Sequence, residues 1–96
     1  MAIEDYGRVE LFWIVPDMNR KRYYSISVEP GLFGPMLVRS WGRIGVGKLR
    51  SKEQFFPEGN LNEALEKANK LLAIKLRKGY AMNDQILLLN SDTDMI

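Results

Sequence analysis

Alternation of apolar and polar positions over the first half of the chain predicts β-strands. In the second of these segments Tyr24, Ile26 and Val28 face one side, and the intervening residues face the other. Pro16 ends the first segment, and Gly45-Val46-Gly47 turns the chain after the third. The predicted strands span residues 8–15, 22–28, 36–44 and 48–56. Because consecutive strands joined by short loops pair antiparallel, we expect one antiparallel sheet.

A change of period after residue 60 predicts one α-helix. Asn60 and Glu63 match a capping box, in which the Asn side chain accepts from the helix N-terminus and Glu63 reaches back. Gly79 is typical of a C-cap, and the last turn carries the cations that a helix dipole favours, Lys75, Arg77 and Lys78. One apolar stripe comprises Leu61, Ala64, Leu65, Ala68, Leu71, Leu72 and Leu76.

The helix stripe needs an apolar sheet face to cover. The predicted fold class is therefore α+β, a four- to five-stranded antiparallel sheet with one α-helix packed on one face. Residues 80–82 are expected to add a short edge strand.

Composition narrows the possible functions. The chain has 96 residues, enough for one domain, and contains neither Cys nor His. Disulfides, thiolate nucleophiles, imidazole bases and most transition-metal sites are thereby excluded. We expect no catalysis, no cofactor and no metal. No segment is long and apolar enough to span a membrane, and the acidic N-terminus differs from a signal peptide, so a cytoplasmic location is expected.

Charge divides the chain into two parts. The net charge is +2, but residues 83–96 contain three Asp and no Lys or Arg, which leaves +5 for residues 1–82. We predict a domain over 1–82 and an acidic, polar tail over 83–96, flexible or docking. The apolar run 86–89 either packs back on the domain or contacts a second subunit.

The third predicted strand carries the candidate chemistry. Arg39, Trp41 and Arg43 share one face at period two, while Gly42 indicates a bulge or a close approach by another group. If the next turn pairs the strands, a basic ribbon surrounds Trp41, formed by Arg39, Arg43, Lys48, Arg50 and Lys52. Cations beside an exposed ring suit a nucleic-acid backbone. The alternative is a core Trp on an ordinary solvent-facing strand, and the pattern alone favours that alternative.

Residues 37–45, with the sequence LVRSWGRIG, resemble the motif of the WGR domain. Residues 19–24, the loop at 29–34 and the helix end at 75–80 resemble the same family in order and spacing, the loop matching short, stand-alone bacterial members. The resemblance covers about residues 8 to 82. It implies an antiparallel sheet with one helix, and a domain that accompanies the catalytic domain of DNA-damage-responsive poly(ADP-ribose) polymerases.

The resemblance also implies roles for individual residues. Trp41 would stack against a sugar or terminal nucleotide, and Arg43 would contact the backbone or a partner domain. Tyr80 belongs either to the same surface or to the packing of the helix end. We therefore expect DNA binding directed at the backbone, with an indole open to solvent; the alternative is a protein-interaction adaptor that uses the same face or the run 86–89. The predicted binding residues are Trp41, Arg43, Arg39, Lys48, Arg50, Lys52 and Tyr80.

Overall fold

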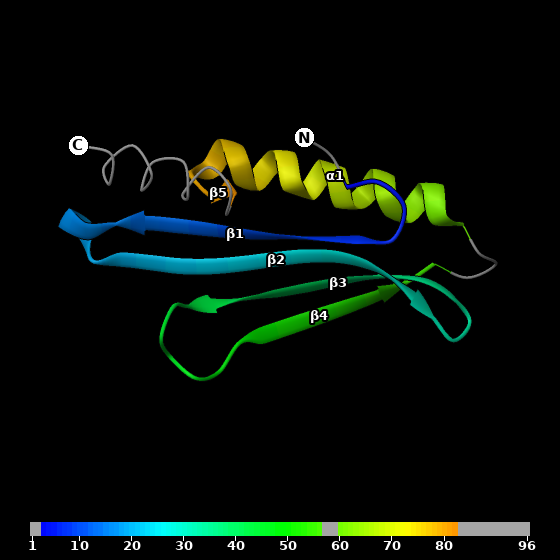
Figure 1. Ribbon diagram of the computed structural model, residues 1–96, viewed down its shortest axis with the longest axis horizontal. Coiled ribbons are helices and arrows are strands. Elements are labelled where there is room, and N and C mark those ends of the chain that lie inside the picture. Colours follow the sequence, from blue (N-terminus) through cyan, green and yellow to red (C-terminus); the bar gives the residue numbers. More distant parts are fainter. Residues whose placement is uncertain (1–2, 57–59, 83–96) are drawn as a thin grey trace, which may run out of the picture.

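The computed structural model describes residues 3–56 and 60–82 and confirms the predicted α+β fold (Figure 1). Five strands form one sheet with antiparallel pairing in the order β4-β3-β2-β1-β5. One helix packs against one face of this sheet. The elements are β1 (Gly7–Val15), the 3-10 turn η1 (Pro16–Met18), β2 (Arg20–Gly31), β3 (Gly34–Arg43), β4 (Arg50–Phe55), α1 (Leu61–Lys78) and β5 (Ala81–Met82).

Short turns join the first three strands, so that neighbours in sequence are neighbours in the sheet. Pro16 opens η1, where its fixed φ suits a helical turn, and Asn19 closes η1 with a φ of 50°. Asn adopts this left-handed conformation more readily than most residues. The two-residue turn Leu32–Phe33 joins β2 to β3 and leaves these side chains 94% and 84% exposed.

The start of α1 agrees with the capping prediction, with one difference. The Asn60 side chain accepts a hydrogen bond from the backbone N–H of Glu63 at 3.2 Å. The Glu63 carboxylate accepts from the side-chain amide of Asn60 at 2.9 Å, whereas the standard capping box uses the backbone N–H. Both interactions hold the first turn in place.

Gly79 ends the helix, as predicted. Its φ of 133° is one that L-residues rarely adopt. Its N–H donates to the Leu76 carbonyl at 3.3 Å, and the N–H of Tyr80 donates to the Lys75 carbonyl at 3.1 Å. A Cβ at position 79 would lie 2.6 Å from Cε2 of Trp13. The absent side chain therefore allows both the end of α1 and the close approach of the Trp13 indole.

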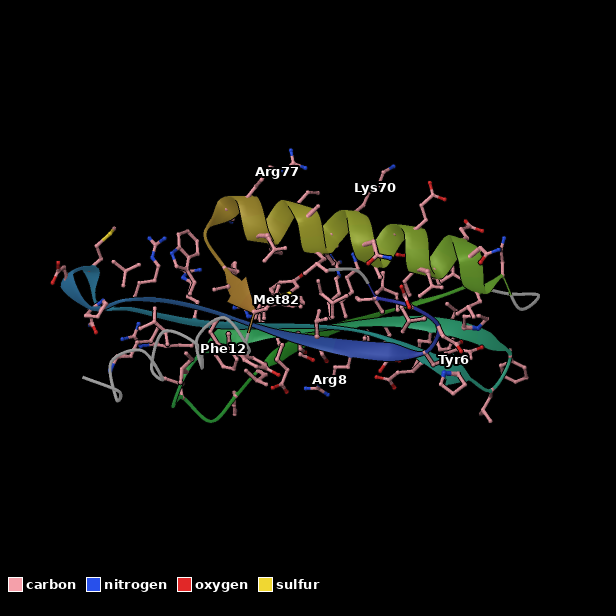
Figure 2. All side chains as sticks on the ribbon, turned by 45° about the horizontal axis from the view of Figure 1, so that its top comes forward. Tyr6, Arg8, Phe12, Lys70, Arg77 and Met82 are labelled. Atoms are coloured by element: carbon pink, nitrogen blue, oxygen red, sulfur yellow. The ribbon has the colours of Figure 1, made fainter. Side chains whose placement is uncertain are left out.

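The core lies between α1 and one face of the sheet. Ala64, Ala68 and Leu72 form the buried centre of the predicted helix stripe. Small residues at two of these positions let the helix approach the strands closely. Figure 2 shows Arg8 on the opposite side of the sheet from α1. The buried strand residues beneath the helix are Leu11, Tyr24, Ile26, Val28 and Leu37.

Strand boundaries differ from the prediction where tertiary pairing extends or shortens a segment. β2 is longer than the predicted 22–28 because β1 pairs with its first residues and β3 with its last, which satisfies their backbone groups. β4 is an edge strand that begins at Arg50, so Lys48 lies in the preceding loop. β5 falls within the predicted 80–82 and pairs with β1. The predicted tail, with its apolar run at 86–89, lies outside the described residues.

Replacing Gly79 by Ala should destabilise the fold strongly. The Cβ would meet the rigid Trp13 indole and would also require an unfavourable φ. We expect Gly79→Ala to lower the free energy of unfolding by about 3 kcal/mol, measured by urea denaturation followed by circular dichroism. Gly47→Ala is the control, because nothing lies within 4 Å of a Cβ there and a change below about 0.5 kcal/mol is expected. Equal denaturation midpoints for the two variants would contradict the described packing.

Candidate functional site

The register of the β3–β4 hairpin places most of the predicted basic residues on one face of the sheet. Residues directly opposite in an antiparallel pair share a face. Arg39 lies opposite Lys52, and Trp41 lies opposite Arg50. Leu37, two residues before Arg39, is buried in the core beneath α1. The face that carries the helix is therefore also the face that carries the motif.

Acidic and basic side chains of the strands occupy opposite faces. The acids Glu10, Glu29 and Glu53 alternate onto the face away from α1. Within the described residues, one ion pair is found, between Arg8 and Glu10 at 3.2 Å on that same face. The charged side chains that the strands contribute to the helix-bearing face are all basic: Arg20, Arg22, Arg39, Arg43, Arg50 and Lys52. This segregation leaves a positive surface without neighbouring carboxylates from the sheet.

Four aromatic rings form a contiguous row across this face near the end of α1. Trp13 and Tyr80 are tilted, with ring centroids 5.4 Å apart. Tyr80 and Tyr24 form a T-shaped pair with ring centroids 5.9 Å apart. Tyr24 stacks on Trp41 at 5.9 Å with an interplanar angle of 18°. The row joins rings from β1, β2 and β3 with Tyr80, the residue directly before β5. These contacts hold the rings in fixed orientations.

Trp41 is half-buried, where the sequence led us to expect an indole open to solvent. The difference arises because Tyr24 stacks against the ring from the neighbouring strand. The indole still borders a pocket of about 250 Å³, together with Arg22, Arg43 and Tyr80. A planar group entering this pocket would meet an aromatic wall and two guanidinium groups.

Arg43 is held in place by the β1–β2 turn. Its Nη1 and Nη2 atoms donate to the backbone carbonyl and the side-chain oxygen of Asn19, each at 3.1 Å. Neither acceptor is charged, so these bonds do not compensate the positive charge, and the other N–H donors stay available. Gly42, beside it, confirms the expected close approach, since a Cβ there would lie 2.8 Å from Cδ2 of Leu49.

Three further cations at the site were not among the predicted binding residues. The Arg20 guanidinium lies over the Trp13 ring at 4.2 Å, and the Lys75 ammonium lies over Tyr24 at 4.5 Å. Arg22 was missed in the same way, although it lines the Trp41 pocket. The basic run 20–22 ahead of the tyrosines was the available signal, whereas Lys75 was explained by the helix dipole alone.

Burial shifts the pKa of three ionisable groups at the site, and nearby positive charges add to the shift of one of them. Burial raises the pKa of Tyr24 above its ordinary value, and burial likewise raises the pKa of Tyr80. Desolvation lowers the pKa of Lys75, and the nearby charges of Lys78 and Arg39 lower it further. Both charges acting on this ammonium are positive. A bound anion would therefore relieve an existing repulsion at the site.

The predicted residues do not all meet at one place. Trp41, Arg43 and Tyr80 line the same pocket, although Tyr80 is largely buried and contributes mainly as a wall. Arg39 and Lys52 lie further along the strands in a second hollow beside α1. Arg50 lies opposite Trp41, whereas Lys48 stands outside the strand in the loop 44–49.

In residues 3–56 and 60–82, no group of three or more His, Cys, Asp or Glu side chains is placed to hold a metal ion. The helices within the same ranges are also too short or too polar to cross a membrane. The site is thus an aromatic and cationic surface with a small pocket.

Comparison with known proteins gives one family and one curated relative. Residues 6–86 match the family model described as the WGR domain. An uncharacterized protein, y4dW, from Sinorhizobium fredii (strain NBRC 101917 / NGR234) is 39% identical over 66 residues, which is 68% of this chain and 31% of that protein. The chain thus spans less than a third of the length of this relative. No solved structure gave a significant match.

The raised tyrosine pKa values predict a pH-dependent loss of stability. The folded state binds the phenolic protons of Tyr24 and Tyr80 more tightly than the unfolded state, so this stabilisation is present below about pH 10 and is lost as pH rises through the folded pKa values. We expect a late phase in the alkaline absorbance titration of phenolate. Tyr24→Phe and Tyr80→Phe should each reduce that phase, and denaturant should abolish it. A single transition near pH 10 in the folded protein would contradict the described burial.

Proposed function

Because the chain belongs to the WGR domain family, we propose that it is a nucleic-acid-binding module whose partner is DNA. WGR domains are known as nucleic-acid-binding modules. The observation that carries the proposal for this chain is the segregation of strand charges, which puts cations without acids around a row of aromatic rings. Cations of this kind replace the counterions condensed on phosphates, and flat rings stack on sugars or bases.

Trp41 and Arg43 have distinct proposed roles. The half-buried indole offers its remaining surface to a sugar or base that enters the pocket. The Arg43 guanidinium, oriented by Asn19, points its charge at an adjoining phosphate. Arg22 lines the same pocket and supplies a second phosphate contact. Because these groups address backbone and ring faces, little sequence specificity is expected.

We propose that the module performs no catalysis and uses no cofactor. The chain has no Cys or His, and its described acids are not gathered into a site. We also propose a cytoplasmic location, because a chain without Cys is compatible with a reducing compartment.

A protein-interaction adaptor is the second candidate, and one surface feature favours it. The exposed Leu32–Phe33 turn and Phe55 border an apolar hollow of about 360 Å³ at the far end of β3 from Trp41. Exposed apolar groups gathered in this way are typical of protein contacts. Recovery of a single protein partner after nuclease treatment, together with no gel shift on any nucleic acid, would favour this candidate over the first.

Loss of the indole or of the motif guanidinium should weaken binding. We expect Trp41→Ala and Arg43→Gln each to lower affinity for a labelled DNA by more than about tenfold, measured by fluorescence anisotropy. Phe33→Ala and Arg8→Ala are matched controls, since one removes an exposed ring and the other a cation from outside the site. Unchanged affinity in a folded Trp41→Ala variant would reject the role assigned to Trp41.

Binding should also depend steeply on salt. We expect the logarithm of the affinity to fall linearly with the logarithm of the salt concentration, with a slope reduced by about 0.7 to 0.9 in Arg43→Gln. A purified preparation should lose nucleic acid in a high-salt wash, seen as a fall in the ratio of absorbance at the nucleic-acid and protein maxima. A salt-independent affinity would argue against backbone recognition.

A further inference from the structure

A second hollow lies between α1 and the β3–β4 hairpin, beyond the Trp41 pocket. Its volume is about 280 Å³, and three elements contribute to its walls. Arg39 comes from β3, Lys52 from β4, and Lys67 and Lys70 from α1. We call this hollow the helix–hairpin groove. Neither the family resemblance nor the motif residues assigned a role to its helix side.

The helix–hairpin groove is cationic on both sides. No Asp or Glu lines it, and its cations form no ion pair with any described carboxylate. Glu63 and Glu66 line a separate hollow together with Lys67 and Lys70, but they form no ion pair with these lysines. Lys70 projects away from the sheet and forms the outer rim (Figure 2). Lys52 from β4 and Lys67 from α1 thus line the groove from its hairpin side and its helix side.

The floor of the groove is apolar, which a site for isolated phosphate would not require. Leu37, Leu71 and Ile74 line it, and Ile74 is 53% exposed. Lys67, Lys70, Leu71 and Ile74 follow one another at helical spacing, so a single stripe of α1 presents both cations and apolar surface. A ligand that fits this lining carries anionic groups along an apolar or aromatic body.

The groove and the Trp41 pocket lie along the same face of β3, which supplies Arg39 to the groove and Trp41 and Arg43 to the pocket. Arg39 lines the groove, and its charge acts on both Tyr24 and Lys75 at the aromatic row. Along β3, Arg39 and Arg43 are four residues apart, or about 13 Å. That length corresponds to roughly four stacked nucleotides at about 3.4 Å each. One strand can thus occupy the pocket and the groove in succession.

We propose that the helix–hairpin groove binds single-stranded nucleic acid that continues from the Trp41 pocket, with Lys52 and Lys67 contacting successive phosphates and the apolar floor contacting bases or sugars. This inference rests on the proposed function and specifies its ligand. A double helix presents its backbone outward and keeps its bases stacked inside, so an apolar floor adds nothing to duplex binding. A single strand exposes base faces that pack on such a floor.

The test compares single and double strands in a variant confined to the groove. We expect Lys52→Ala/Lys67→Ala to lower the affinity for a dodecamer of thymidine at least about fivefold and to reduce the salt slope by about 1.4, the value for two phosphate contacts on a single strand. Affinity for a blunt duplex of equal length should fall no more than in the control variant. Oligouridine separates RNA from DNA, and preferential loss on either single strand supports the proposal.

Arg8→Ala/Lys21→Ala is the matched control, because it removes two positive charges from the face of the sheet away from α1. Circular dichroism establishes that each variant is folded. Equal losses of affinity in the groove and control variants, or a greater loss on duplex than on single strands, would overturn the role proposed for the groove. The proposed function would still stand if Trp41→Ala weakened binding. Absence of wild-type binding to every nucleic acid would overturn both.

Discussion

The contact between Gly79 and the Trp13 indole determines how much of the sheet the helix covers. At position 79 only glycine combines the required backbone conformation with the space that the indole occupies. One further turn would carry α1 about 5.4 Å onward, over the rings that meet at its present end. The helix instead stops, and Tyr80 turns toward the sheet to join Trp13 and Tyr24. The Trp41 pocket is open because α1, which covers the core, is shorter than the sheet beneath it.

Charge segregation gives the uncovered end its electrostatic character. Like charges on one face repel over distances comparable with the Debye length, about 8 Å at physiological ionic strength. The folded protein carries this repulsion because no strand acid shares the face. The pKa of Lys75 is lowered first by burial and then by the nearby positive charges of Lys78 and Arg39, which are part of this repulsion. This repulsion lowers the stability of the protein alone, and a bound anion would offset it. Anion binding and stability are coupled in this way.

The sequence predicted the fold well because the relevant signals are local. Strand alternation, the cap at Asn60 and the helix-ending Gly79 all depend on neighbouring residues, and each is confirmed. The site was predicted less completely because its members meet through strand register and helix placement. Trp41 was expected to be exposed, but Tyr24 covers part of it from the adjacent strand.

The cations outside the motif were harder to anticipate from the sequence. Arg20 reaches the site across the β1–β2 pair, and Lys75 reaches it from the last turn of α1. Conversely, Lys48 continued the period-two pattern in the sequence, yet it lies in the loop because β4 begins later. No local pattern distinguishes these cases, since each depends on where a distant element packs.

The hydrogen bonds between Asn19 and Arg43 have a consequence for the entropy of association. A long side chain that is free in solution loses about 0.5 to 1.5 kcal/mol of rotamer freedom when a ligand immobilises it. Arg43 is already restrained by two acceptors on a residue 24 positions away in the chain. Arg43 therefore loses much of its rotamer freedom during folding and not on binding. The conformation of the β1–β2 turn thus sets how rigidly the motif guanidinium is oriented.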